Sequence, residues 1–188
     1  NKNSSLIIDF GFTDGYQSSS SNKKNSLNHL FANFEADLAL EKFTNSQFFL
    51  SLKKVSNDTY LKVFDGNIFK SNVTPTDYNT LESEAKLILN NDDYRFTAGF
   101  QSFENLTLAK SDRYQFILPY YNFDKQIFND YENGSINFSS NGSNELNNTN
   151  NLKTVITNNI NFNSFDLISN NGFKSAYNLY FKNLNTVA

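Results

Sequence analysis

Strict alternation of apolar and polar side chains constrains this chain more than any other feature of its sequence. Between residues 30 and 41 the even positions are all apolar, whereas the odd positions include Glu35, Asp37 and Glu41. Successive side chains of a β-strand point to opposite faces, so a strand separates these two sets, whereas an α-helix would mix them around its circumference. The segment therefore predicts a strand with one apolar face and one face that carries carboxylates.

The same alternation returns in other segments, at residues 6–13, 81–89, 94–101 and 176–182. A short polar turn at residues 90–93 joins two of them, which is typical of a β-hairpin. Less regular strand candidates lie at residues 48–55, 60–64, 114–123, 135–140, 155–162 and 165–168. We predict an all-β fold, an antiparallel meander of roughly ten strands, with no helix of useful length.

Turn signals separate the predicted strands. Asp-Gly and Asn-Gly pairs tolerate the positive φ of tight turns, and such pairs occur at residues 14–15, 65–66, 133–134, 141–142 and 171–172. Longer polar connections are predicted at residues 17–26, 67–79 and 142–151. Short turns and longer loops occur together at the two ends of a membrane β-barrel.

Composition narrows the fold class further. Only 38% of the residues are hydrophobic, yet 20 Phe and 10 Tyr bring the aromatic share to 16%. A disordered chain is poor in aromatic residues, whereas a sheet with one apolar face needs many large apolar side chains on that face alone. No linker or shift in composition divides the chain, so we predict a single domain over residues 1–188.

Charge and residue types exclude several functions. The net charge is -3, and no run of Lys or Arg could follow a phosphate backbone, so nucleic-acid binding is not expected. Cysteine is absent, which excludes disulfides, thiolate metal sites and thiol catalysis. No apolar stretch is long enough for a membrane-spanning helix. Because the chain begins at Asn1 and contains no Met, we expect it to be a piece of a longer protein.

Three features favour lipid-facing strands over the strands of a soluble core. The longest alternating runs are about ten residues, or roughly 33 Å, which suits a tilted membrane strand. Charges lie near the middle of the polar faces, where a water-filled lumen accommodates them. Aromatic residues recur near predicted strand ends, as membrane-interface girdles do. These residues are Tyr60, Phe64, Tyr94, Phe103, Tyr114, Tyr120 and Tyr121. We predict a fragment of a large transmembrane β-barrel.

Two alternatives stay open, a soluble extracellular β-sandwich or adhesin-type binding module, and a different outer-membrane barrel such as a porin. In a barrel the apolar residues form an outward band on a single sheet, whereas in a sandwich they meet one another across two packed sheets. The residues that discriminate between these folds are Leu30, Phe34, Leu38, Leu81, Leu87, Phe96 and Phe100.

Three blocks of sequence carry a resemblance to a known family. Residues 55–61 are Val-Ser-Asn-Asp-Thr-Tyr-Leu, residues 96–106 combine a strand with aromatics and Asn-Leu, and residues 114–121 end in Ile-Leu-Pro-Tyr-Tyr. In content, order and spacing these blocks resemble the central part of the barrel domain of the lipopolysaccharide-assembly outer-membrane proteins, the LptD or organic solvent tolerance family. Neither the family's periplasmic N-terminal domain nor its C-terminal strands nor its cysteines has a counterpart here.

The resemblance implies a function in the cell outer membrane. Members of that family insert lipopolysaccharide into the outer leaflet through a very large barrel plugged by the lipoprotein LptE, with a lateral opening between the first and last strands. It implies lipopolysaccharide, LptE and outer-membrane lipids as partners, and transport instead of catalysis. The family-motif residues carried over, all in structural roles, are Val55, Ser56, Asp58, Tyr60, Leu61, Leu118 and Pro119.

Candidate catalytic groups are few, and we predict no enzyme activity, cofactor or metal. His29 is the only histidine, it stands at a predicted strand start, and we interpret it as a polar loop residue. Neither a G-x-S-x-G nor an H-E-x-x-H motif is present. Carboxylates two residues apart on a strand share a face automatically, so we interpret them as solvated lumen lining. The lumen-facing candidates are Glu35, Asp37, Glu82, Glu84, Lys86 and Arg95. Pro119 is expected at a strand end or a bulge.

Overall fold

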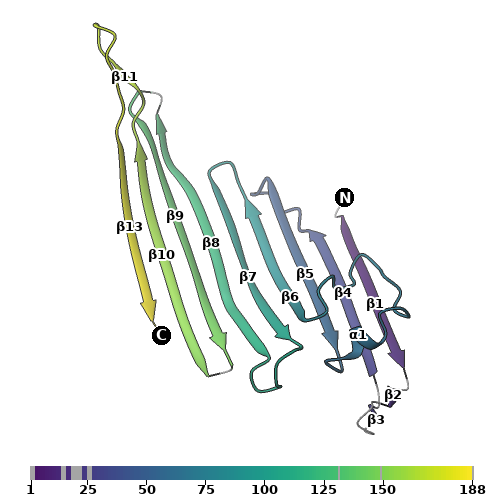
Figure 1. The fold of residues 1–188 in the computed structure, drawn as a ribbon. Helices are drawn as coiled ribbons and strands as arrows, with labels where there is room; N and C mark the ends of the chain where they lie inside the picture. Colours follow the sequence, from purple (N-terminus) through teal and green to yellow (C-terminus); the bar gives the residue numbers. More distant parts are fainter. Residues whose placement is uncertain are drawn as a thin grey trace.

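A computed structural model describes residues 3–13, 16–17, 23–24, 27–130, 132–148 and 150–187. These residues form one nine-stranded antiparallel sheet in the order β1-β4-β5-β6-β7-β8-β9-β10-β13, spread as a single layer (Figure 1). Its strands are β1 (Ser4–Thr13), β4 (Leu27–Asp37), β5 (Asn45–Val55), β6 (Thr80–Asn90), β7 (Tyr94–Asn105), β8 (Tyr114–Asp130), β9 (Gly134–Asn147), β10 (Asn151–Asn163) and β13 (Asn178–Val187). The predicted all-β meander is confirmed. The sheet is open, with β1 and β13 at its edges.

Two short strand pairs and one helix accompany the sheet. They are a pairing of β2 (Tyr16–Gln17) with β3 (Lys23–Lys24), a pairing of β11 (Leu167–Ile168) with β12 (Lys174–Ser175), and the single-turn helix α1 (Tyr60–Val63). Within the described part of the chain, no helix is long and apolar enough to cross a membrane.

The pairing register sorts the side chains onto two faces, as the alternation predicts. One face, called the polar face below, carries all six predicted charged residues, namely Glu35, Asp37, Glu82, Glu84, Lys86 and Arg95. The opposite face, called the apolar face, carries cross-strand rows such as Leu6, Phe34, Leu50, Ala85 and Phe100. Cross-strand neighbours of this kind are the main side-chain contacts within a sheet.

The predicted strand at residues 60–64 is wrong, because this segment contains α1. Asn57 Oδ1 accepts hydrogen bonds from the Thr59 backbone N–H at 2.9 Å and from Thr59 Oγ1 at 2.7 Å. An asparagine that binds the backbone two residues on forms a turn, and this local turn overrides the β-propensity of Tyr60 and its neighbours. The chain therefore leaves β5 and turns immediately into the helix.

The predicted turn at Asn141-Gly142 and the predicted polar connection at 142–151 are also wrong. Strand β9 continues through both to Asn147, and the turn to β10 is short. A Cβ on Gly142 would lie 2.5 Å from Cε1 of Tyr121, so the glycine makes room for this ring on the neighbouring strand. Side-chain pairs such as Thr154 Oγ1 to Asn144 Oδ1, at 2.7 Å, support the polar strands.

Other predicted boundaries shift for local reasons. Strand β4 ends at Asp37, whose side chain accepts the Ala39 N–H at 2.9 Å, so the predicted strand over 30–41 is too long. Gly134 and Gly172 have φ of 128° and 79°, as turn glycines require. The predicted Asp14-Gly15 turn lies outside the described residues.

The buried apolar core is small and lies toward one end of the sheet. It consists of Leu27, Phe31, Val55, Tyr60, Leu61, Ile68, Val73, Leu81 and Leu106. Four of these side chains belong to the segment between β5 and β6, called loop 56–79 below, which contains α1 (Figure 1). The loop explains Phe31, an apolar residue at a polar-face position that is fully buried beneath it.

Candidate functional site on the polar face

Loop 56–79 is attached to the polar face at the ends of β4 and β5. Two hydrogen bonds join Asn28 and Ser56 there, because the Ser56 N–H donates to the Asn28 carbonyl at 2.9 Å and the Asn28 N–H donates to the side-chain Oγ of Ser56 at 2.8 Å. Beyond this point Tyr60 and Leu61 turn their side chains into the core, where they are 3% and 0% exposed. Buried apolar contact and backbone hydrogen bonds thus hold the loop against the strands.

A buried hydrogen-bond network joins the loop to the first two strands of the sheet. His29 Nε2 lies 3.1 Å from Asp9 Oδ1, and His29 Nδ1 lies 2.9 Å from the Tyr60 hydroxyl. The other Asp9 oxygen accepts hydrogen bonds from Ser71 Oγ at 2.9 Å and Thr74 Oγ1 at 3.4 Å. Both nitrogens of the ring and both oxygens of the carboxylate therefore have partners, as buried polar groups require.

The sequence interpretation of His29 as a polar loop residue is wrong. His29 lies within β4, is 4% exposed, and stacks on Phe31 with 4.6 Å between ring centroids. Opposite His29 across the β1–β4 pair stands Gly11, where a Cβ would lie 2.3 Å from His29 Cε1. Burial raises the pKa of the Tyr60 hydroxyl, and the nearby Asp9 carboxylate raises it further. The arrangement fixes the loop, and Tyr60 is too buried to meet a substrate.

A second polar cluster lies on the same face, centred on Glu84. Its Oε1 accepts hydrogen bonds from the Tyr120 hydroxyl at 2.7 Å and from Gln101 Nε2 at 2.9 Å, and its Oε2 lies 2.9 Å from Lys86 Nζ. A Cβ on Gly99 would lie 2.8 Å from the Tyr120 hydroxyl, so the absence of a side chain there lets the tyrosine lie across β7. Glu84 is thus a well-partnered carboxylate within a wet surface.

The family-motif residues divide into two groups in space. Val55, Tyr60 and Leu61 pack into the core, Ser56 binds Asn28, and Asp58 lies 3.4 Å from Arg113. The spacing of residues 55–61 therefore serves to start loop 56–79 and to anchor it.

Leu118 and Pro119 lie elsewhere, inside β8, and are joined by a cis peptide bond. The pairing of β8 with both neighbours shifts register around them, so Pro119 occupies an irregularity where its missing N–H interrupts no ladder bond. This is the bulge that the sequence predicted. Because β8 runs on to Asp130, Tyr120 and Tyr121 are not at a strand end, contrary to expectation.

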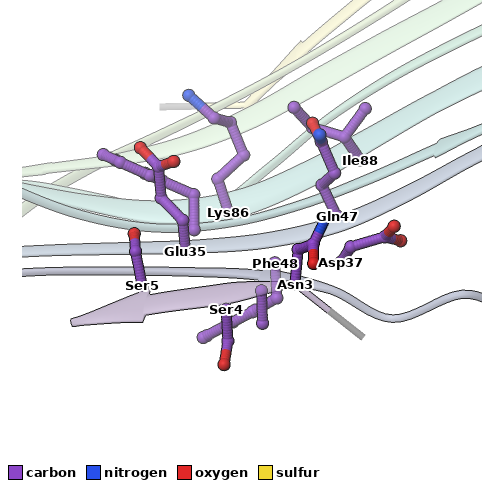
Figure 2. Close-up of a pocket in the computed structure, with 11 residues that line it drawn as sticks. Asn3, Ser4, Ser5, Glu35, Asp37, Gln47, Phe48, Lys86 and Ile88 are labelled. Atoms are coloured by element: carbon purple, nitrogen blue, oxygen red, sulfur yellow. The ribbon is translucent and has the colours of Figure 1, made fainter. Parts of the chain in front are cut away.

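Hollows indent the described part of the sheet. One of about 680 Å³ has Glu35, Gln47, Lys86 and Ile88 along its wall, and Figure 2 shows these side chains projecting to one side of the ribbon while Ser4 projects to the other. Another, of about 1000 Å³, extends from the start of β5 to β13. Amides and hydroxyls dominate part of its lining, with Asn137, Ser139, Asn159, Asn161 and Tyr180.

The apolar face, by contrast, exposes large side chains to its surroundings. Phe10 is 66% exposed and Phe181 63%, at opposite edges of the sheet. Of the seven discriminating residues, five lie on this face and are at least partly exposed; Leu81 has the same facing in the register but is buried in the core, and Leu38 follows the end of β4. The five are Leu30, Phe34, Leu87, Phe96 and Phe100. Among the described residues, no second sheet packs against them.

The described part of the chain brings no three acidic or histidine side chains into an arrangement that could hold a metal ion. The most organised polar constellation, Asp9 with His29 and Tyr60, was not predicted, because β-pairing and a loop bring together residues far apart in the sequence. Comparison with protein-family models, with curated proteins and with solved structures finds no match to this chain.

Proposed function

We propose that the chain forms part of the wall of a transmembrane β-barrel in the bacterial outer membrane. The observation that carries this proposal is the exposed apolar face of a single antiparallel sheet, opposite a face lined with charges and amides. A monomeric protein in water rarely leaves so large a continuous apolar surface exposed. Lipid acyl chains on one side and a water-filled lumen on the other suit both faces.

The position of the apolar residues along successive strands supports the barrel. The pairing places Ser4 of β1 and Asn185 of β13 in one cross-strand row. On β1 the apolar residues, Leu6 to Phe12, come after the row position Ser4 in the sequence. On β13, which runs in the same direction, Leu179 and Phe181 precede it, and two asparagines separate them from Val187.

The apolar band therefore shifts along the strands as it crosses the sheet. Between β1 and β13 the midpoint moves by about ten residues over eight strand-to-strand steps, or a little more than one residue per strand. At 3.3 Å per residue and 4.8 Å between strands, a level band requires strands tilted by roughly 40°. Transmembrane barrels tilt their strands by about 35–45°.

Polar residues mark the borders of the band on the apolar face. Toward one end of the strands, Lys54 Nζ lies 2.8 Å from Glu104 Oε2 and 5.0 Å from the centre of the Tyr114 ring. Toward the other end, Lys125 pairs with Tyr94 across the β7–β8 ladder. Lysine and tyrosine favour the membrane interface, because the charge or hydroxyl reaches water while the rest contacts lipid.

We propose further that the barrel delivers lipopolysaccharide to the outer leaflet. The resemblance of residues 55–61, 96–106 and 114–121 to the LptD family supports this narrower proposal. It brings with it the lipoprotein LptE as a plug and outer-membrane lipids as surroundings. The six charged residues of the polar face would then line the lumen.

Membrane fractionation of the full-length protein tests the barrel. We expect it in the outer-membrane fraction, with slower electrophoretic migration after boiling as the barrel unfolds; recovery in the soluble fraction would overturn the proposal. Depletion of the protein tests the cargo. We expect lipopolysaccharide to accumulate on the inner side of the outer membrane and to be depleted from the cell surface. Unchanged surface lipopolysaccharide in depleted cells would indicate a different barrel, such as a porin.

A further inference from the structure

Loop 56–79 crosses the polar face as far as the edge strand. It leaves β5, covers the neighbouring end of β4, and reaches β1, where Ser71 Oγ binds Asp9 Oδ2 across 62 residues of sequence. In the described part of the chain, no other segment is anchored across the sheet in this way. One end of the polar face over β1, β4 and β5 is therefore covered.

The contacts of the loop are those of a fixed structure. Its Ile68 and Val73 side chains are 9% and 2% exposed, within the same core as Phe31. Inside the loop, the Tyr78 hydroxyl donates to Asp65 Oδ1 at 2.6 Å, and Lys70 Nζ lies 3.1 Å from the same oxygen. Opening the loop would expose this core and would leave His29 Nδ1 and Asp9 Oδ2 without their partners from the loop, so the closed position is strongly favoured.

The other half of the polar face is open. The hollow has a volume of about 1000 Å³ and extends from the start of β5 to β13, where the neutral side chains of Asn159, Asn161 and Tyr180 line it. The Tyr180 hydroxyl donates to Asn159 Oδ1 at 2.9 Å and the ring remains exposed. Amides and hydroxyls line the hollow over β10 and β13, whereas the carboxylates in its lining, Asp92, Asp93 and Asp124, lie on the side of β6 to β8.

We propose that loop 56–79 is a fixed partition inside the barrel, which closes the lumen beside β1, β4 and β5. Polar molecules then pass only along the open side over β8 to β13. This inference rests on the proposed barrel, but it goes further, because it assigns a blocking role to one loop and a path to one half of the face. The loop remains in place while molecules pass.

A reversible cross-link tests whether the loop moves. The chain has no cysteine, so Asp9→Cys with Ser71→Cys introduces the only pair that can join the loop to β1. In the full-length protein reconstituted in planar bilayers, oxidation should leave the single-channel conductance and its blocking by large polysaccharides unchanged. A loss of conductance on oxidation, restored by a reductant, would show a moving gate and overturn the partition. Each single cysteine variant is the control for oxidation itself.

Two further variants test where the path lies. Replacing residues 60–78 by a short Gly-Ser linker should raise the conductance roughly twofold or more, because the covered side then opens. Asn161→Arg, on the open side, should shift ion selectivity toward anions. If the linker variant conducts as the wild type does, or Asn161→Arg leaves selectivity unchanged, the partition is refuted. These recordings use the protein without the plug lipoprotein; wild-type protein that then forms no channel contradicts the barrel itself, so the two failures are distinguishable.

Discussion

The two halves of the sheet hold their shape by different means. Over β1, β4, β5 and β6, the polar face carries carboxylates and a histidine, and loop 56–79 buries apolar side chains against it. Over β9, β10 and β13, the same face carries mostly amides and hydroxyls, with Glu145, Lys153 and Lys182 among them, and no described segment covers it. The first half resembles a small globular core built on a sheet, and the second relies on its strand ladder and on what contacts its two faces.

This difference teaches where the chain depends on its surroundings. In the first half, Phe31 and Leu61 are removed from any solvent by the protein itself. In the second half, residues such as Ile160 and Phe181 are 42% and 63% exposed, so their environment decides what they contribute. Substitutions in the two halves should therefore respond differently to the same change in side chain or medium.

The largest expected effect is on the core of the first half. Phe31→Ala should destabilise the folded protein by about 3–5 kcal/mol, because it leaves a cavity at a fully buried position. Phe181→Ala, the matched change on the exposed apolar face, should cost much less. Urea unfolding of the protein refolded in detergent micelles, followed by the migration shift on electrophoresis, measures both. Equal losses would show that the two halves are stabilised alike.

The next largest expected effect is a difference in stability between substitutions on the two faces of β10. Ile160→Arg places a charge on the apolar face and should cost roughly 2–4 kcal/mol in lipid. Asn159→Arg, the adjacent residue on the polar face, should cost close to nothing, because its side chain faces water. Unfolding in lipid vesicles gives both values. If Asn159→Arg proves the more destabilising change, the polar face does not contact water and the apolar face does not contact lipid.

A smaller effect is expected from the network that joins the loop to β1. His29→Ala should cost about 1–3 kcal/mol, because one Asp9 oxygen and the Tyr60 hydroxyl lose buried partners. The double variant with Tyr60→Phe should lose less than the sum of the single changes, as residues of one network do. Strict additivity in the same unfolding assay would mean that the two side chains act independently.

The smallest effect concerns pH at the exposed part of the loop. The hydrogen bond from Tyr78 and the nearby Lys70 lower the pKa of Asp65 below its ordinary value of 3.8. A lowered folded-state pKa stabilises the loop above the unfolded value and loses this contribution as the pH falls through the folded value. In wild-type protein, the protection of amides 65–78 against exchange, relative to the unstructured chain at the same pH, should fall on acidification below about pH 4.

Asp65→Asn provides the matched control for this pH effect, because asparagine does not titrate. The variant should have lower protection than wild type at neutral pH and should lose little more on acidification. An acid-induced loss of protection of the same size in both proteins would place the titrating group elsewhere.

Alternation predicted the strands because each side chain reports on its own face. The six charged residues from Glu35 to Arg95 therefore fall on one face, as expected. Features that depend on a contact between two strands were harder to predict. Asn141-Gly142 has turn chemistry, yet the glycine serves the ring of Tyr121 on another strand. A single sequence contains no signal of that contact before the register is known.

The site was predictable only in part, for the same reason. Residues 55–61 were singled out, but their turn into α1 depends on Asn57 binding Thr59, which competes with a plausible strand at Tyr60. His29 looked like a loop residue, because its partners Asp9 and Tyr60 lie 20 and 31 residues away. The only signal available was that Asp9 and Gly11 lie on one predicted strand and His29 lies at the start of the next.

The location of the core also has a consequence for how the chain assembles. Its side chains, and the network at Asp9, all come from residues 9–106, so they need nothing from β8 onward. In a chain that folds from its N-terminus, the loop can dock before the second half arrives. The earliest assembly intermediate would then already be a stable template, with the free edge of β7 ready to pair with each following strand in turn.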